Sequence, residues 1–263
     1  MRSLFVVVVL VAAFFVLGRL LSRFIAYPGS PLPFIPATLP PGVTLADVKT
    51  ADGLTLRGAW VRSGAADAPV VLFFHGNAES AAQNLPLAGE IAAFGLDVFL
   101  AEYRGYGGMD GHPGERGLMQ DAEAALAAVQ AAGTPPGRLA LAGRSLGTGV
   151  AVALAAASPP AVLVLVSPYT SFTDLGRRMV GPLAPLLVLD RFDSLSRIRS
   201  LRCPVVVIHG TRDETIPFEM GERLAKAAPE GRLVTLTGAT HNDMPGLGSL
   251  IAAEVRRALP PAG

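Results

Sequence analysis

Short apolar runs alternate with longer amphipathic stretches along most of the chain. Apolar runs of this kind are typical of strands buried on both faces of a parallel sheet. The predicted strands are VVLFFH (70–75), LDVFLAEY (96–103), RLALAG (138–143), AVLVLVS (161–167), VVVIHG (205–210) and RLVTLT (232–237). Helices are predicted near residues 79–94, 115–132, 146–157, 217–228 and 246–259. The alternation predicts an α/β fold with a mostly parallel central sheet and helices on both faces.

Two segments depart from this rhythm. Residues 43–50 and 54–61 alternate apolar and polar positions around Ala51-Asp52-Gly53, which predicts a β-hairpin. Residues 168–202 are long for a simple connection, so they are interpreted as a short cap inserted between two strands. We therefore expect one domain over residues 43–263, with the cap inside it.

The N-terminus is strongly apolar, with no charge from Ser3 to Gly18. That stretch spans only about 24 Å as a helix, short of a bilayer core near 30 Å, but continuing to Ile25 makes the length sufficient. Residues 1–27 are interpreted as an uncleaved single-pass membrane anchor, in which Arg19 and Arg23 reach the interface. A cleaved signal peptide and a buried core helix are the alternatives. The Pro-rich residues 28–42 then form an extended linker.

Composition excludes several functions. The 263-residue chain has 22 basic and 21 acidic side chains and a net charge of +1, so it lacks the basic field that nucleic-acid binding needs. Its single cysteine, Cys203, excludes an internal disulfide and a cysteine-cluster metal site. The motifs of zinc proteases, phosphate-binding loops and dinucleotide-binding loops are missing or incomplete. We expect no cofactor and no metal, and a small-molecule or lipid-like substrate as partner.

A serine lies at a sharp corner after the strand at 138–143. Gly143-Arg144-Ser145-Leu146-Gly147 matches the G-x-S-x-G pattern, in which a strained strand-to-helix turn exposes the serine hydroxyl. Ligands of parallel sheets bind at the carboxyl ends of the strands, which is where this serine falls. Ser145 is therefore the predicted nucleophile, and a tight strand–helix joint is the alternative.

A nucleophilic serine needs a base and an acid that orients the base. His241 follows the last predicted strand, where it can lie over a serine on a middle strand, and Asp213 follows the penultimate strand. Glu214 is the alternative acid. His75 is more consistent with holding its own loop than with catalysis. The backbone N–H groups of Leu146 and Asn77, the latter in the loop after residues 70–75, are the expected donors to the oxyanion.

These residues resemble those of the α/β-hydrolase superfamily. The resemblance covers about residues 25–259 and is closest to the small membrane-anchored serine hydrolases that include serine aminopeptidase-like, lysophospholipase-like and depalmitoylase-like enzymes. The matching segments are FIAYPGS, TADGLTLRGAW, FFHGNAES, EYRGYGGMDGHPGERGLMQDAEAAL, GRSLGTGVA, SPYTSF, RFDSLSRI, CPVVVIHGTRDETIPFEMGERL and GATHND. The resemblance implies an α/β-hydrolase fold. It also implies that Ser145, Asp213 and His241 form a catalytic triad, with Asn77 and Leu146 at the oxyanion hole.

The resemblance implies hydrolysis of a carboxylic ester or thioester through an acyl-enzyme. The apolar segment GPLAPLLVL (181–189) favours a lipid-like acyl group, unless it is only the core of the cap. A serine peptidase of the same fold is the alternative enzyme. A catalytically silent member that binds a partner at the membrane is the alternative outside catalysis.

Overall fold

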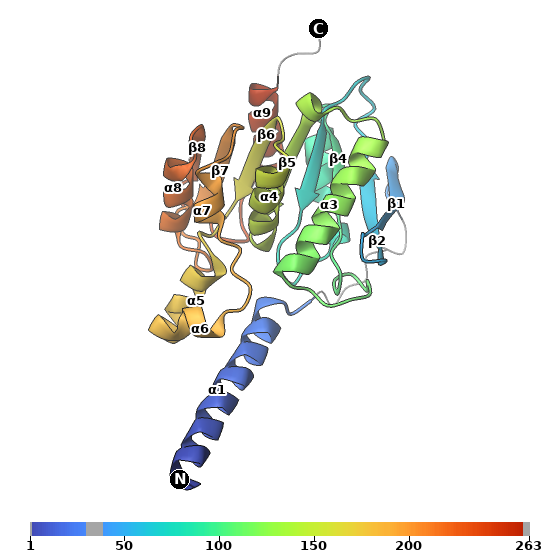
Figure 1. Cartoon of the computed structure of the whole chain (residues 1–263). Helices are drawn as coiled ribbons and strands as arrows, with labels where there is room; N and C mark the ends of the chain where they lie inside the picture. The colour runs from blue at the N-terminus through green and yellow to red at the C-terminus, as the bar shows by residue number, and fades with distance from the viewer. Residues whose placement is uncertain (1, 30–38, 260–263) are drawn as a thin grey trace.

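Eight strands form one sheet in the computed structural model, which describes residues 2–29 and 39–259 (Figure 1). The strands are β1 (Val43–Lys49), β2 (Thr55–Val61), β3 (Val70–Phe74), β4 (Asp97–Ala101), β5 (Leu139–Arg144), β6 (Val162–Val166), β7 (Val205–Gly210) and β8 (Gly231–Leu236). Their order is β1-β2-β4-β3-β5-β6-β7-β8. β1 and β2 form the predicted antiparallel hairpin, β2 pairs antiparallel with β4, and the strands from β4 to β8 are parallel.

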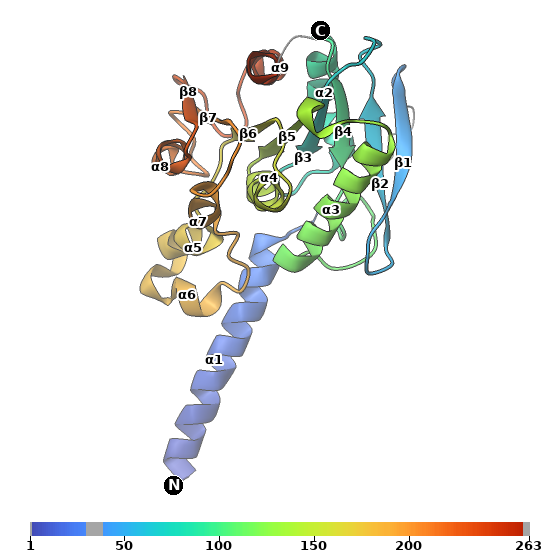
Figure 2. The same cartoon turned by 45° about the horizontal axis from the view of Figure 1, so that its top comes forward.

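Helices cover both faces of the sheet (Figure 2). Their bounds are α2 (Leu85–Ala92), α3 (Glu115–Ala131), α4 (Leu146–Ala157), α8 (Phe218–Ala227) and α9 (Leu247–Ala258). Side chains of α3, α4 and α8 share one buried apolar cluster, and those of α2 and α9 share a second cluster on the other face. β3 to β7 are almost wholly buried because they lie between these two clusters, which explains their continuous apolar sequences.

The predicted elements are confirmed within a few residues. The largest internal difference is at 79–94, where the chain starts as a 3-10 turn (η1, Ala81–Asn84) before α2. Ser80 and Gln83 cap this turn, and Pro86 at the start of α2 suits a helix that begins there. A further short 3-10 turn, η2 (Pro136–Arg138), leads into β5.

The segment predicted as a cap lies between β6 and β7. It contains α5 (Phe172–Val180), a 3-10 turn η3 (Gly181–Leu183), α6 (Ala184–Leu187) and α7 (Ser194–Ile198). Ser171 is the N-cap of α5, and its side chain accepts a hydrogen bond from the N–H of Asp174. α5 and α6 lie beside the end of the first helix, α1 (Arg2–Ala26), which projects away from the sheet (Figures 1 and 2).

The predicted membrane anchor is wrong. Within residues 2–29 and 39–259, no helix combines the length and the apolar composition needed to cross a membrane. The prediction needed the turns after Gly18 to reach the thickness of a bilayer, but those turns are docked on the domain. The Nε of Arg19 donates to the carbonyl of Leu186 at 3.0 Å, and Ser22 donates to that of Leu187 at 2.8 Å.

The N-terminal helix and the hydrolase domain are separated by the segment predicted as a linker. The proline-rich linker expected at 28–42 falls largely on residues 30–38, which lie outside the described part of the chain. The division into N-terminal segment, linker and hydrolase domain stays a prediction.

Candidate active site

Ser145 occupies the sharp corner between β5 and α4. Its backbone has φ 50° and ψ −116°, a left-handed conformation that is strained for a residue with a side chain. Its N–H donates to the carbonyl of Val166 at 2.9 Å, which fixes the corner to β6. This is the turn that the G-x-S-x-G pattern predicts, and it lifts the hydroxyl to the carboxyl end of the sheet.

The glycines of the motif allow the close packing of this corner. A Cβ on Gly143 would lie 2.4 Å from the carbonyl oxygen of Gly147, and a Cβ on Gly147 would lie 2.1 Å from that of Phe74. No side chain fits at those distances. The start of α4 can therefore rest directly on the end of β3, beside the loop that carries Asn77.

The structure brings Ser145, His241 and Asp213 together from three different loops. His241 Nε2 lies 3.1 Å from the Oγ of Ser145. His241 Nδ1 lies 2.9 and 3.1 Å from the two carboxylate oxygens of Asp213. A histidine that donates through Nδ1 presents its other nitrogen as an acceptor, which is the arrangement a general base requires. Glu214, the alternative acid, is exposed, and no hydrogen bond joins it to His241.

Asp213 is held ionised by several donors. Burial alone would raise its pKa, but hydrogen bonds from His209, His241, the N–H of Ile216 and Ser167 outweigh burial and hold the pKa well below its usual range. Ser167 Oγ donates to Asp213 Oδ2 at 2.7 Å, and His209 Nε2 lies 3.2 Å from the same oxygen.

Sequence reasoning missed His209 and Ser167. His209 lies in the predicted strand 205–210 and Ser167 ends the predicted strand 161–167, and the sequence pattern indicates no role for either. Each is a polar residue at the carboxyl end of a buried strand next to the site, and that position is the signal that could have found them.

His75 and Glu102 form a buried ion pair beneath the loop after β3. His75 Nε2 lies 2.7 Å from Glu102 Oε1, and His75 Nδ1 lies 2.8 Å from the carbonyl oxygen of Gly76. Burial by itself would lower the pKa of His75, but Glu102 raises it above its ordinary value overall. The two ring nitrogens contact a carboxylate and a backbone carbonyl, so the imidazole holds the loop from below. This geometry supports the structural role predicted for His75.

The two predicted oxyanion donors lie next to Ser145. Leu146 opens α4, where the first N–H groups of a helix have no partner within the helix. Asn77 follows Gly76, and a Cβ on Gly76 would lie 3.5 Å from the Cβ of Ser145, so this loop runs alongside the nucleophile. The expectation that both N–H groups donate to one oxygen bound at Ser145 stays a prediction.

Arg144 connects the three loops of the site. Its guanidinium donates to Asn242 Oδ1 at 2.9 Å and to the carbonyl of His241 at 3.3 Å. It also pairs with Glu79 of the loop after β3, with 3.5 Å between nitrogen and oxygen. Glu79 in turn accepts a short hydrogen bond from the N–H of Gly76. One side chain beside the nucleophile therefore links the loops that carry His241 and Asn77.

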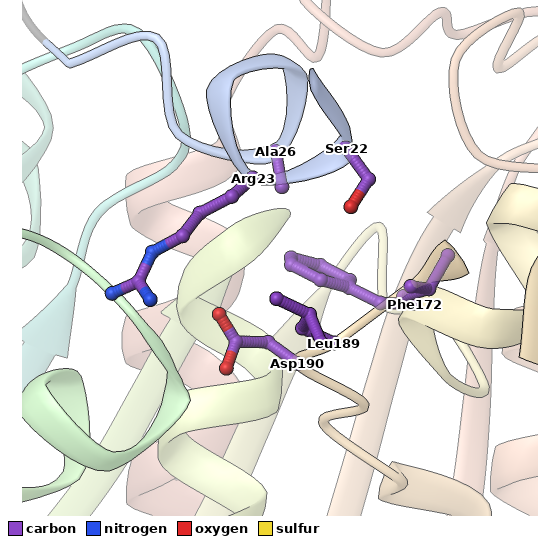
Figure 3. Close-up of a pocket in the computed structure, with 7 residues that line it drawn as sticks. Ser22, Arg23, Ala26, Phe172, Leu189 and Asp190 are labelled. Atoms are coloured by element: carbon purple, nitrogen blue, oxygen red, sulfur yellow. The ribbon is translucent and has the colours of Figure 1, made fainter. Parts of the chain in front are cut away.

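A pocket lies between the end of α1 and the cap (Figure 3). Ala26, Phe172, Val188 and Leu189 supply apolar walls, and the charged side chains of Arg23 and Asp190 stand at one side. Within the described residues, no group of three or more His, Cys, Asp or Glu side chains is arranged to hold a metal ion.

Comparison with known proteins agrees with this architecture. The family model of serine aminopeptidase, S33, matches residues 65–195. An uncharacterised protein of Mycobacterium tuberculosis is 41% identical over 228 residues, which cover 84% of this chain and 80% of that protein. The chain belongs to the α/β-hydrolase superfamily. The alpha/beta hydrolase domain-containing protein 17C of Xenopus tropicalis is 34% identical over 200 residues, 74% of this chain and 63% of that protein.

Solved structures of the superfamily share the fold. An α/β hydrolase from Vibrio vulnificus has a TM-score of 0.69 and 25% identity, and covers 83% of this chain and 82% of its own. An esterase of Pyrococcus furiosus has a TM-score of 0.68 and 19% identity, and covers 89% of this chain and 99% of its own. The chain is accordingly a serine hydrolase enzyme with an α/β-hydrolase fold.

Proposed function

We propose that this hydrolase cleaves a carboxylic ester or thioester with a lipid-like acyl group, and that Ser145, His241 and Asp213 form its catalytic triad. The observation that carries the proposal is the continuous chain of contacts from Asp213 through His241 to the Oγ of Ser145, at 2.9 and 3.1 Å. Asp213 orients the imidazole and stabilises its charged form during the reaction.

The reaction proceeds in two halves. His241 takes the proton of Ser145 while Oγ attacks the carbonyl carbon, and the N–H groups of Asn77 and Leu146 stabilise the oxyanion. The leaving group departs with the proton from His241, and an acyl-enzyme remains. His241 then takes a proton from water, which attacks the acyl carbon. The bond to the Oγ of Ser145 breaks, His241 returns the proton to this oxygen, and the acid is released.

The cap supports an apolar acyl group. In the segment 181–189, Leu183, Leu186 and Leu189 are 41%, 49% and 47% exposed, whereas Ala184 and Leu187 are buried. Only part of this segment therefore serves as the core of the cap. The remaining apolar side chains on the surface of the cap favour an apolar acyl group over a polar substrate.

Fluorophosphonate labelling tests the proposal, with the wild type compared with Ser145→Ala and His241→Ala. We expect the wild type to be labelled and both variants to lose labelling while they remain folded. A folded wild type that is never labelled and turns over no ester would refute the enzyme and favour a silent binding protein. Hydrolysis of aminoacyl arylamides in place of p-nitrophenyl esters of increasing chain length would favour a peptidase.

A further inference from the structure

The side chain of Asn77 is hydrogen-bonded at both ends, to two segments outside its own loop. Its Oδ1 accepts from the hydroxyl of Tyr106 at 2.6 Å, and its Nδ2 donates to the carbonyl of Ala26 at 2.9 Å. Tyr106 is fully buried and its ring packs against His75, so the position of its hydroxyl is fixed by packing. Ala26 is the last residue of α1. The predicted oxyanion loop is thus fastened to the N-terminal helix.

The end of α1 is itself held in place by polar contacts. The last carbonyls of a helix lack partners within the helix, and the amide of Asn77 satisfies one of them. Arg19 and Ser22 donate to carbonyls of α6, as described above, and Arg23 donates to the carbonyl of Pro113 at 2.9 Å. Figure 3 shows Ser22, Arg23 and Ala26 on this last part of α1, where Ser22 and Ala26 point toward Phe172 of the cap and Arg23 extends to the side.

The conformation of the loop after Asn77 needs such support. Ala78 has φ 57°, a left-handed conformation that costs a non-glycine residue about 1 kcal/mol or more and persists only where its surroundings enforce it. An oxyanion donor must also point at the developing charge within a narrow tolerance. The two bonds that hold the side chain of Asn77 therefore limit how far its backbone can move.

We propose that Tyr106, Asn77 and the carbonyl of Ala26 form a clamp that positions the oxyanion loop, so that docking of α1 on the domain controls the rate of acyl transfer. This inference rests on the proposed function, in which the N–H of Asn77 stabilises the oxyanion. Tyr106 and the end of α1 are positioning elements, because they act through Asn77 and do not touch the reacting atoms.

The first test is Tyr106→Phe, with Tyr27→Phe as its matched control. Tyr27 lies just after Ala26 and is also buried, but its hydroxyl has no hydrogen-bond partner among the described residues. A misplacement of about 1 Å can cost on the order of 100-fold in rate, and loss of one of two clamp bonds allows a smaller shift. We expect kcat for an activated ester to fall about tenfold in Tyr106→Phe, with KM nearly unchanged, and to stay near wild type in Tyr27→Phe.

The second test loosens α1 far from Ser145. The double variant Arg19→Met/Ser22→Ala removes the polar contacts to α6 and leaves Asn77, Tyr106 and the triad intact. We expect kcat to fall in this variant as well, and amide hydrogen exchange of residues 76–79 to become faster in both it and Tyr106→Phe. Faster exchange of this loop with an unchanged melting temperature would show that the variants loosen the loop without destabilising the whole protein.

The outcomes distinguish the clamp from the proposed function. Wild-type activity that depends on Ser145, together with unchanged kcat and unchanged loop exchange in both variants, would overturn the clamp alone. A wild type without Ser145-dependent turnover would overturn the proposed function, and the exchange of residues 76–79 would still decide whether the loop depends on Tyr106 and α1.

Discussion

Two glycines in helices of this protein should respond in opposite ways to the same substitution. Gly147 lies in the first turn of α4, and Gly89 lies in α2. A Cβ on Gly147 would lie 2.1 Å from the carbonyl oxygen of Phe74 and 2.7 Å from that of His75. A Cβ on Gly89 would meet nothing within 4 Å. Gly147→Ala and Gly89→Ala therefore form a matched pair.

The magnitudes follow from the surroundings. A carbon normally approaches a carbonyl oxygen to about 3.3 Å, so the new methyl at 147 overlaps Phe74 by about 1.2 Å. β3 cannot yield, because it is paired on both sides with β4 and β5. Overpacking of this kind lowers the free energy of unfolding by about 3 kcal/mol. Replacing a helical glycine by alanine raises it by about 1 kcal/mol at either position, because alanine has the higher helix propensity. We expect Gly147→Ala to be destabilised by about 2 kcal/mol and Gly89→Ala to be stabilised by about 1 kcal/mol.

Activity should separate the two variants further. The overlap in Gly147→Ala pushes α4 away from β3, which moves Ser145 relative to the loop of Asn77. Such a shift costs on the order of 10- to 100-fold in kcat, whereas Gly89→Ala should retain wild-type kcat. Urea unfolding gives the free energies, and hydrolysis of a p-nitrophenyl ester gives kcat. Equal stability and equal kcat in the two variants would refute the packing argument.

The polar contacts of the site give two further predictions. Because its donors hold the pKa of Asp213 well below its usual range, the carboxylate stays ionised as pH falls to 4, and its stabilising contribution is lost only below its ordinary pKa of about 3.9. The rate of fluorophosphonate labelling between pH 4 and 9 should therefore follow a single ionisation that is not the protonation of Asp213; a second ionisation on the acid side would contradict this. Arg144→Met should lower kcat about tenfold because it releases the loops of His241 and Asn77 from each other. Added guanidinium should restore part of the rate. No rescue, together with a lower melting temperature, would show that the arginine only stabilises the fold.

Most of the fold could be predicted because its signals are local. Strands buried on both faces must be apolar throughout, so β3, β5, β6 and β7 stand out from the helices between them. The G-x-S-x-G corner is equally visible, since Gly143 and Gly147 are required by contacts within one turn and one neighbouring strand. The residue types expected for base and acid also lie at the strand ends, and the structure places His241 and Asp213 beside Ser145.

The supporting contacts could not be predicted because their partners are far apart in sequence. Arg144 meets Asn242 across 98 positions, and Asn77 meets Ala26 across 51. No spacing rule links such pairs, and Arg144, Asn242 and Asn77 each resemble an ordinary polar position. The pairing of Arg144 with Asn242 depends on which strand ends lie side by side, and therefore on the strand order β4-β3-β5-β6-β7-β8. The pairing of Asn77 with Ala26 depends on how α1 docks on the domain.

The N-terminal helix shows how the same residues support different interpretations. In the sequence, Arg19 and Arg23 follow a long apolar stretch, and an interfacial position explains their charge. In the structure, Arg19 and Arg23 donate to the carbonyls of Leu186 and Pro113, so the last turns of α1 belong to the surface of the enzyme. Guanidinium groups bind carbonyl oxygens as readily as they bind solvent, and sequence carries no sign of which partner is present. The polar contacts that dock the last turns of α1 are thus the ones that bring Ala26 to Asn77. A helix docked by its charged turns can influence the site that it touches.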